Sequence, residues 1–287
     1  MANEAYLLDT TDILAWMPTK FVPAIDGYWK EQLSVAQAVT DYSGRYAGGA
    51  KAISVPLVPL TASTAKTSGT ALSYGDLTDV LAGTITMSTQ KALAFLIEDI
   101  SQMQTDVAIF QSFYMAAGDR LAMDLDALVA TTVQGETTNT AITTGTDNTV
   151  TWANMLTAQS TFNAQRIKIR NCAMGIAPGA FELSVADWGD KYTSAAHRGE
   201  TGQSFAYTGI EGVILGMPVF VDSNWTSGQT DECATIWHPT AVGFVSSGPI
   251  LVGPTPEPLH LGTGFALHQV MGCSVLNAYG VLKIVND

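Results

Sequence analysis

The sequence has little charge for its length, and very little of that charge is positive. Charged residues make up 14 % of the 287 residues, with 13 Lys and Arg against 26 Asp and Glu, so the formal net charge is −13. Proteins that grip nucleic acid through its phosphates normally carry clustered Lys and Arg. The balance therefore disfavours a nucleic-acid-binding function, although an acidic wall can lie beside DNA without adhering to it.

Cysteine and histidine are scarce, and none of them stands at a ligand spacing. The chain has three cysteines and four histidines: Cys172, Cys233, Cys273, His197, His238, His260 and His268. The absence of CxxC and HExxH argues against a disulfide framework, a zinc site and a metalloprotease. A GxSxG nucleophile motif and a phosphate-binding loop with its lysine are absent too. We therefore expect no catalytic, metal-binding or cofactor-binding residues, and a protein that is not an enzyme.

No hydrophobic run reaches the length of a signal-peptide core or of a membrane-spanning helix, although 47 % of the residues are hydrophobic. We expect no membrane partner and synthesis in the cytoplasm. A usual globular chain carries roughly a quarter charged residues. With fewer charges, much of the surface must be uncharged, and such a surface suits burial against neighbouring subunits.

Carboxylates gather at two places in the middle of the chain. Glu98 and Asp99 are adjacent, and Asp119, Asp124 and Asp126 follow within one expected helix. Such groups could form an acid and base pair or a cation site. Carboxylates on an exposed helix face are usually solvated, and this is the interpretation that we favour.

The densest basic cluster of the chain consists of Arg166, Lys168 and Arg170. Two of these residues fall on alternate positions of an expected strand. The cluster could meet DNA or an acidic patch on a neighbouring chain, and we favour pairing across an interface between chains.

Hydrophobic periodicity in the first half predicts an elongated molecule. The proline-free stretch from Thr89 to Thr131 has apolar residues at helical spacing and predicts one long helix, which Gly118 could interrupt. Two β-rich pieces, 53–58 and 84–87, flank a linker rich in small residues and predict a long β-hairpin with a mobile tip. Roughly 40 helical residues span about 60 Å, more than the diameter of about 50 Å for a compact chain of this size.

The second half predicts a mixed α/β domain. Thr151 can cap a helix with Trp152, Met155, Leu156 and Phe162 on one face. The elements expected after it are a strand at 172–177, a helix at 181–188, one apolar strand at 213–221, strands near 234–237 and 243–246, and two strands within 264–285.

Three segments stand out in this order of parts: Gly-Ile-Ala-Pro at 175–178, the glycine-rich run 209–219, and Ala-Tyr-Gly-Val at 278–281. With the order of the parts, they resemble the major capsid proteins of tailed bacteriophages, whose fold is shared with encapsulins and with the floor of herpesvirus capsids. The resemblance implies an α+β fold with five parts: an N-terminal arm (1–48), an extended β-hairpin loop (49–88), a peripheral domain with a spine helix (89–150), an axial domain (151–263), and closing strands of the peripheral domain (264–287).

The function that the resemblance implies is structural. Such a subunit assembles as pentamers and hexamers into an icosahedral shell around phage double-stranded DNA, which it approaches without specific contacts. Its partners would be other copies, a portal protein, a decoration protein in some relatives, and a scaffolding protein, which we expect to be separate because the arm starts almost at Met1. Assembly would take place in the host cytoplasm, and the product would be part of the virion.

Some relatives crosslink a loop lysine to an asparagine on a neighbour. Lys51 and Lys66 lie in the loop segment, but no matching asparagine is identifiable, and we do not expect this crosslink. Two alternatives remain open. The first is an encapsulin-type compartment that holds a cargo enzyme, and the second is a cytoplasmic enzyme with an unfamiliar site.

Overall fold

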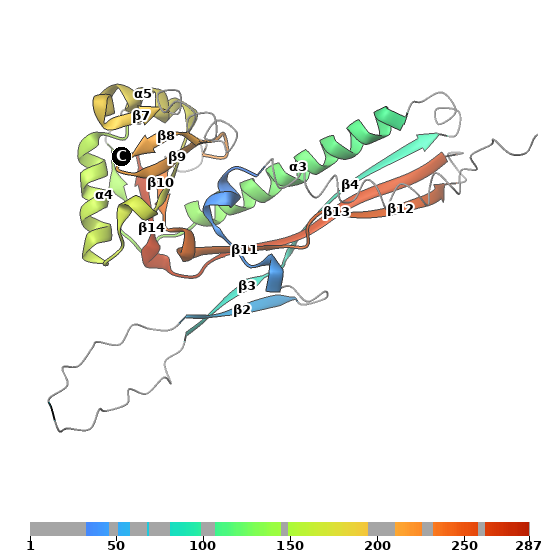
Figure 1. The fold of residues 1–287 in the computed structure, drawn as a ribbon, viewed down its shortest axis with the longest axis horizontal. Coiled ribbons are helices and arrows are strands. Elements are labelled where there is room, and N and C mark those ends of the chain that lie inside the picture. Colours follow the sequence, from blue (N-terminus) through green and yellow to red (C-terminus); the bar gives the residue numbers. More distant parts are fainter. Residues whose placement is uncertain are drawn as a thin grey trace, which may run out of the picture.

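The computed structural model describes residues 33–45, 51–57, 68, 81–98, 107–144, 149–194, 210–225, 232–257 and 262–286. Figure 1 shows an elongated molecule with a compact α/β body at one end and a long helix beside a long sheet. A β-hairpin projects from the long sheet near the body. This is the expected α+β architecture. Of the helices described, none has the length and hydropathy needed to cross a membrane.

The long sheet is built around β13, which pairs along both of its edges. Its strands are β1 (Thr40–Asp41), β4 (Thr89–Glu98), β11 (Val242–Ser246), β12 (Ile250–Glu257) and β13 (Gly262–Val275). β11 and β12 follow one another along one edge of β13, and β4 runs antiparallel along the other edge from Gly262 to Met271. β1 adds a short parallel strand to β11.

The spine helix is shorter than the sequence pattern predicts. α3 spans Val107–Gln134, 28 residues or about 42 Å, and runs through Gly118 without a break. The expected start of the helix at Thr89 is wrong, because Thr89–Glu98 forms β4. Apolar residues at 93 and 95 alternate with exposed neighbours, and pairing with β13 satisfies the backbone. In a short apolar stretch, periodicity alone does not separate the two structures.

The compact body contains a seven-stranded sheet. In spatial order its strands are β5 (Ile142–Thr143), β14 (Val281–Val285), β10 (Glu232–Trp237), β6 (Ala173–Ile176), β9 (Met217–Val221), β8 (Ile210–Ile214) and β7 (Tyr192–Ser194). Two helices accompany it, α4 (Trp152–Ala164) and α5 (Pro178–Trp188). Short 3-10 helices lie at Val35–Ala38, Ser43–Arg45, Ile169–Asn171, Gly189–Lys191, Pro239–Ala241 and Ala278–Gly280.

The chain crosses between the two sheets twice near its C-terminal end. β10 leads through Pro239–Ala241 into β11 of the long sheet, and β13 returns through Ala278–Gly280 into β14 of the seven-stranded sheet. The His238 backbone N–H donates to the Gly280 carbonyl at 2.8 Å and holds the two crossings together. The sheets therefore do not divide at residue 263: β11 and β12 precede it but lie in the long sheet, and β14 follows it but lies in the other.

The expected single strand at 213–221 is wrong, because this segment forms the hairpin of β8 and β9. Leu215 and Gly216 lie between the two strands with φ of 51° and 84°. Positive φ at both central residues is typical of the tight two-residue turns that join antiparallel strands. Leucine seldom adopts this conformation, so the turn has a weak signal in the sequence.

Helix α4 begins at the predicted cap. The Thr151 hydroxyl accepts from the Asn154 backbone N–H at 3.3 Å, and Met155 and Phe162 are buried as expected. The predicted apolar face is wrong at Leu156, which is 44 % exposed. Helical spacing places Leu156 at the border of the buried face of α4, where the described residues of the body cover it only in part.

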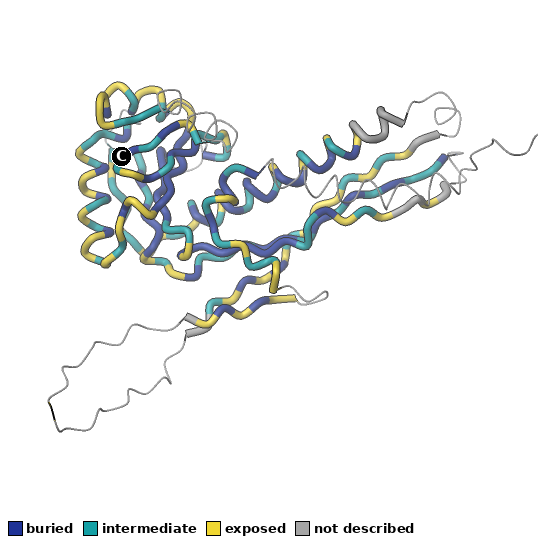
Figure 2. Tube along the Cα trace, viewed as in Figure 1, coloured by how far each residue is buried: buried dark blue, intermediate teal, exposed yellow. Residues whose placement is uncertain are grey.

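The expected β-hairpin is present as β2 (Ala52–Leu57) and β3 (Leu81–Thr86), which pair antiparallel. One face of its base packs in a small core with residues of β11 and the segment after β13: Ile53, Val55, Ile85, Met87, Val245 and Leu276. The alternation of buried and exposed positions along the hairpin is visible in Figure 2. The expected mobile tip at 61–75, like the first 32 residues of the arm, lies outside the described residues apart from position 68.

Candidate assembly surfaces

The residues with metal or catalytic chemistry are dispersed. In the parts of the chain that the structure describes, no three His, Cys, Asp or Glu side chains form a group able to hold a metal ion. His238 contacts the Thr240 hydroxyl through Nδ1 at 2.8 Å, and burial lowers its pKa. His268 lies half-buried in β13, whereas His197 and His260 fall outside the described residues.

None of the three cysteines forms a disulfide within the described structure. Cys172 and Cys233 are buried and Cys273 is half-buried, as expected for reduced interior residues. Burial raises the pKa of the Cys172 thiol to about 12 and that of Cys273 to about 11. Because the thiolate is the reactive form, Cys172 and Cys273 are unreactive near neutral pH.

Asp126 is not the solvated helix carboxylate that the sequence suggests, since only 4 % of it is exposed. Its Oδ2 accepts from the Ser34 backbone N–H at 2.9 Å and from the Ser34 hydroxyl at 3.0 Å, and its Oδ1 accepts from the Ala36 N–H at 2.8 Å. Burial raises the pKa of Asp126, and the nearby charge of Asp222 raises it further, against these hydrogen bonds. The carboxylate fastens residues 34–36 of the N-terminal arm to α3. Its partners are 90 and 92 residues away in sequence, so no local pattern points to them.

Asp126 forms part of an acidic hollow of about 540 Å³ between α3 and the loop after β9. We define the acidic hollow by its charged residues: Asp119, Arg120, Asp124, Asp126 and Asp222. Arg120 Nη2 lies 3.7 Å from Asp124 Oδ1 and offsets one of the four carboxylates. The hollow therefore has an excess of negative charge.

The basic cluster of Arg166, Lys168 and Arg170 is exposed at all three positions in the loop between α4 and β6. The expected strand is wrong here, because Ile169–Asn171 forms a 3-10 helix and Arg166 has a positive φ of 63°. Among the described residues, the structure shows no ion pair for any of the three. The cluster thus presents three exposed cations that pair with no acidic residue of the described chain.

One face of the long sheet is covered by α3. Tyr114 of α3 is fully buried, and its ring lies 5.3 Å from that of Phe95 and 6.1 Å from that of Phe265. Phe95 and Phe265 themselves stack at 5.9 Å across β4 and β13. Burial raises the pKa of Tyr114 to about 12, so its hydroxyl stays protonated in this aromatic cluster.

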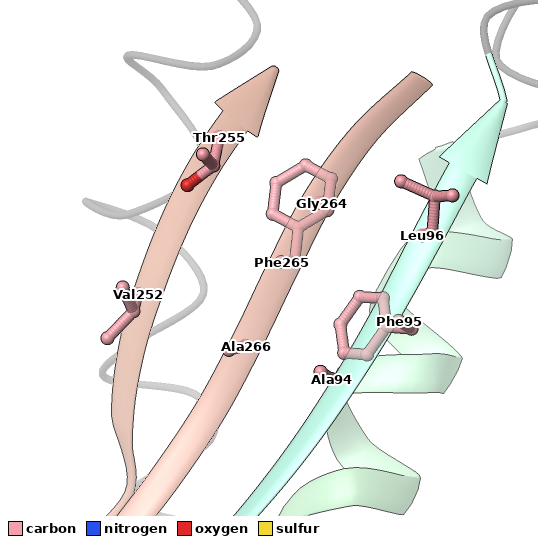
Figure 3. A pocket seen from close by; sticks show the side chains of 8 residues that line it. All are labelled: Ala94, Phe95, Leu96, Val252, Thr255, Gly264, Phe265 and Ala266. Atoms are coloured by element: carbon pink, nitrogen blue, oxygen red, sulfur yellow. The ribbon is translucent and has the colours of Figure 1, made fainter. Parts of the chain in front are cut away.

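The opposite face of the same strands has no cover among the described residues. Residues next to Phe95 and Phe265 along the strands point away from α3. Two rows of them, in register across β4, β13 and β12, form what we call the bare face: Ala94, Ala266, Val252, Leu96, Gly264 and Thr255. Figure 3 shows them around a shallow hollow of about 510 Å³. Val252 is 47 % and Leu96 is 41 % exposed, so this apolar surface lacks a cover within the described chain.

Comparison with known proteins identifies the architecture. Neither a protein-family model nor a curated protein sequence matches the chain. Among solved structures, the capsid of the cyanophage P-SCSP1u matches with a TM-score of 0.63 at 13 % identity, covering 88 % of each chain. The capsid of Ralstonia phage GP4 matches with a TM-score of 0.62 at 11 % identity, over 89 % of this chain and 92 % of that one.

A virus-like particle from Pyrococcus furiosus also matches, with a TM-score of 0.55 at 12 % identity, over 93 % of this chain and 98 % of that one. At these identities the likeness establishes the fold, and it extends over nearly the whole of each chain. The chain therefore has the major capsid protein fold of tailed bacteriophages.

Proposed function

We propose that the chain is the major capsid protein of a tailed bacteriophage, a structural subunit that assembles into an icosahedral shell enclosing double-stranded DNA. The observation that carries the proposal is the bare face of the long sheet. A face with Val252 and Leu96 nearly half exposed gains stability when another copy covers it, at roughly 25 cal/mol per Å² of apolar surface buried. Together with the fold, this favours a subunit of an assembly.

The two sheets support a division of labour. We assign the seven-stranded sheet with α4 and α5 to an axial domain that forms pentamers and hexamers, and the long sheet with α3 to a peripheral domain. The hairpin of β2 and β3 would reach a neighbouring subunit, whereas residues 33–45 of the arm pack on α3 and β11 of their own chain. Surfaces on several sides of one subunit are what a closed shell requires.

Further partners belong to the same proposal. A separate scaffolding protein would guide closure, a portal protein would occupy one vertex, and a decoration protein would bind the outer surface. Packaged DNA would lie beside an inner wall without specific contacts, consistent with the net charge of −13. Assembly would occur in the host cytoplasm, and the chain would have no enzymatic activity and no cofactor.

The experiment that tests the proposal is expression of the chain alone and together with a candidate scaffolding protein, followed by size-exclusion chromatography and negative-stain electron microscopy. We expect closed shells, tubes, or separate pentamers and hexamers. A matched variant with Leu96→Ser and Val252→Ser on the bare face should fold but assemble less. A compact monomer from the unmodified chain under both conditions would refute the proposal.

An encapsulin-type compartment is the second candidate, favoured by the match to the virus-like particle from Pyrococcus furiosus. The two functions differ in what the shell encloses. Nuclease-protected DNA in shells purified from the native source would identify a phage capsid, and a co-purifying enzyme without DNA would identify a compartment. Either result leaves the assembly itself intact.

A further inference from the structure

We propose that the basic cluster of one copy docks against the acidic hollow of a second copy, in a head-to-tail contact that orients neighbouring subunits within a ring. The proposal rests on the shell function above and specifies a contact within it. The occupant of each surface is the same chain, so no further protein is required. The contact involves Arg166, Lys168 and Arg170 on one side and Asp119, Asp124 and Asp222 on the other.

The two surfaces lie at opposite ends of one pair of strands. β6 and β9 are parallel, with Met174 opposite Val219 and Ile176 opposite Val221. The basic cluster precedes β6, and a Cβ placed on Gly216, just before β9, would lie 3.2 Å from the Arg170 Cβ. At the other end, the Asp222 N–H donates to the Ile176 carbonyl at 3.3 Å.

About six residues of extended chain, or roughly 20 Å, separate the two ends. One end of the strand pair is therefore positive and the other is negative. Two different surfaces on opposite sides of a subunit produce a heterologous contact. Each copy binds one neighbour through its basic cluster and the other neighbour through its acidic hollow. Such contacts close into rings when the rotation between neighbours allows it.

The charges favour a second copy as the partner. Three of the 13 basic residues of the chain stand within five positions at the basic cluster, exposed and without an ion pair among the described residues. The acidic hollow is concave and half-buried, so solvent and salt screen its charges less than those of a flat surface. DNA is the poorer partner. The chain that carries these three cations has a net charge of −13, which repels the DNA phosphates.

Crowding of like charge in the acidic hollow supports the same contact. Asp126 is already engaged by Ser34 and Ala36, and Arg120 offsets only Asp124. The negative charge of Asp222 raises the pKa of Asp126, so the two carboxylates interact. A guanidinium group from a neighbouring chain would relieve this repulsion and would form charge-assisted hydrogen bonds with Asp119 or Asp222.

The test is a set of charge reversals in the full chain, scored by shell yield in electron microscopy at ~0.15 M salt. Arg166→Glu with Arg170→Glu should abolish shells, and so should Asp119→Lys with Asp222→Lys. The chain that carries all four substitutions should assemble again, because both surfaces are inverted together. Arg45→Glu with Lys91→Glu changes the net charge by the same four units as the Arg166 and Arg170 pair, at exposed sites elsewhere, and should leave assembly intact.

Mixing the two doubly substituted chains sharpens the test. One variant is acidic at both ends of the strand pair and the other is basic at both ends, so they can only alternate around a ring. Alternation requires an even number of subunits, which permits hexamers and forbids pentamers. The mixture should therefore give hexameric sheets or tubes and no closed shells.

Several outcomes would overturn the contact while leaving the shell function in place. Shells of unmodified chain would establish the function. If Arg166→Glu with Arg170→Glu then assembled as well as the unmodified chain, or if the fourfold variant stayed folded by circular dichroism without assembling, the contact would be wrong. Normal shells of the Arg variant that lose only their packaged DNA would identify DNA as the partner instead.

Discussion

Strands β6 and β4 differ in how far the rest of the chain covers their two faces. All four residues of β6 are buried, so neighbouring elements cover both of its faces. Along β4, half-buried Leu93 and Phe95 alternate with exposed Ala92, Ala94 and Leu96. The seven-stranded sheet completes its core with its own chain, whereas the distal part of the long sheet completes only one face. We therefore expect the body to be stable by itself, and the long sheet to gain stability when another copy covers it.

The largest loss of unfolding free energy is expected when a large side chain is removed from the body. Trp237 is fully buried, stacks on Trp225 at 5.7 Å and donates to the Ala38 carbonyl at 3.0 Å. Trp237→Ala should lower the free energy of unfolding by about 3–5 kcal/mol, measured by urea titration of unassembled subunits. Tyr279→Ala, at a position 60 % exposed, is the control and should change it little. Equal losses of unfolding free energy in the two variants would contradict a body that is stable by itself.

The second prediction concerns the part of the long sheet that the hairpin covers. A Cβ on Gly272 would lie 2.2 Å from the Thr86 carbonyl oxygen, so Gly272→Ala should push the hairpin off β13, at a cost of about 3 kcal/mol. Hydrogen exchange should then accelerate in β2 and β3 but not in the seven-stranded sheet. Gly44→Ala, where a Cβ meets no atom within 4 Å, is the matched control. Uniform acceleration throughout the chain would show that the hairpin is not a separate unit.

The third prediction concerns the join between the arm and α3. Asp126→Asn leaves one backbone donor of Ser34 or Ala36 without an acceptor and should cost about 2 kcal/mol. Because the pKa of Asp126 is raised in the fold, the folded chain holds this proton more tightly than the unfolded chain does. The contribution of this carboxyl to stability is therefore greatest below its ordinary pKa and decreases as pH rises through the raised value.

The advantage of the unmodified chain over Asp126→Asn should accordingly shrink with rising pH, as measured by denaturant titrations at several pH values. The Ser34→Ala variant serves as a control, because it removes one hydroxyl donor and keeps the carboxyl. An advantage that grows with pH would mean that the hydrogen bonds outweigh burial and that the pKa is lowered.

The smallest effect on stability, and a large effect on assembly, is expected on the bare face. Leu96→Ser with Val252→Ser should change the unfolding free energy of unassembled subunits by about 0.5 kcal/mol or less per site, since both side chains are nearly half exposed. Shell yield should nevertheless fall. Leu183→Ser on α5, at 52 % exposure, tests whether any exposed leucine behaves in this way. Equal loss of shells from Leu183→Ser would remove the special status of the bare face.

The elements with strong local signals could be predicted from the sequence. Thr151 stands at the start of α4, and the β-rich segments of the hairpin pair as expected. The helix expected at 181–188 is α5, which begins three residues earlier, with Pro178 at its first position. Each signal depends on a few neighbouring residues, so distant parts of the chain do not alter it. The order of these elements also indicated the fold.

The features that could not be predicted depend on contacts between distant residues. β4 has an apolar spacing that also suits a helix, and only its pairing with β13 selects the strand. Leu215 adopts a turn conformation that its side chain disfavours. Asp126 and the segment at Ser34 are brought together by the tertiary fold alone. The predicted absence of catalytic and cofactor-binding residues stays a prediction.

The continuous strand β13 also has a mechanical consequence. It extends over 14 residues and is hydrogen-bonded on both edges to antiparallel neighbours, with bonds perpendicular to its axis. A tensile force along the strand would load these bonds together in shear, so that many must rupture at once. Peeling one bond at a time would need a force across the sheet. The long axis of the molecule is therefore its stiff direction, and stretching single molecules along it should require a higher rupture force than pulling β12 away sideways.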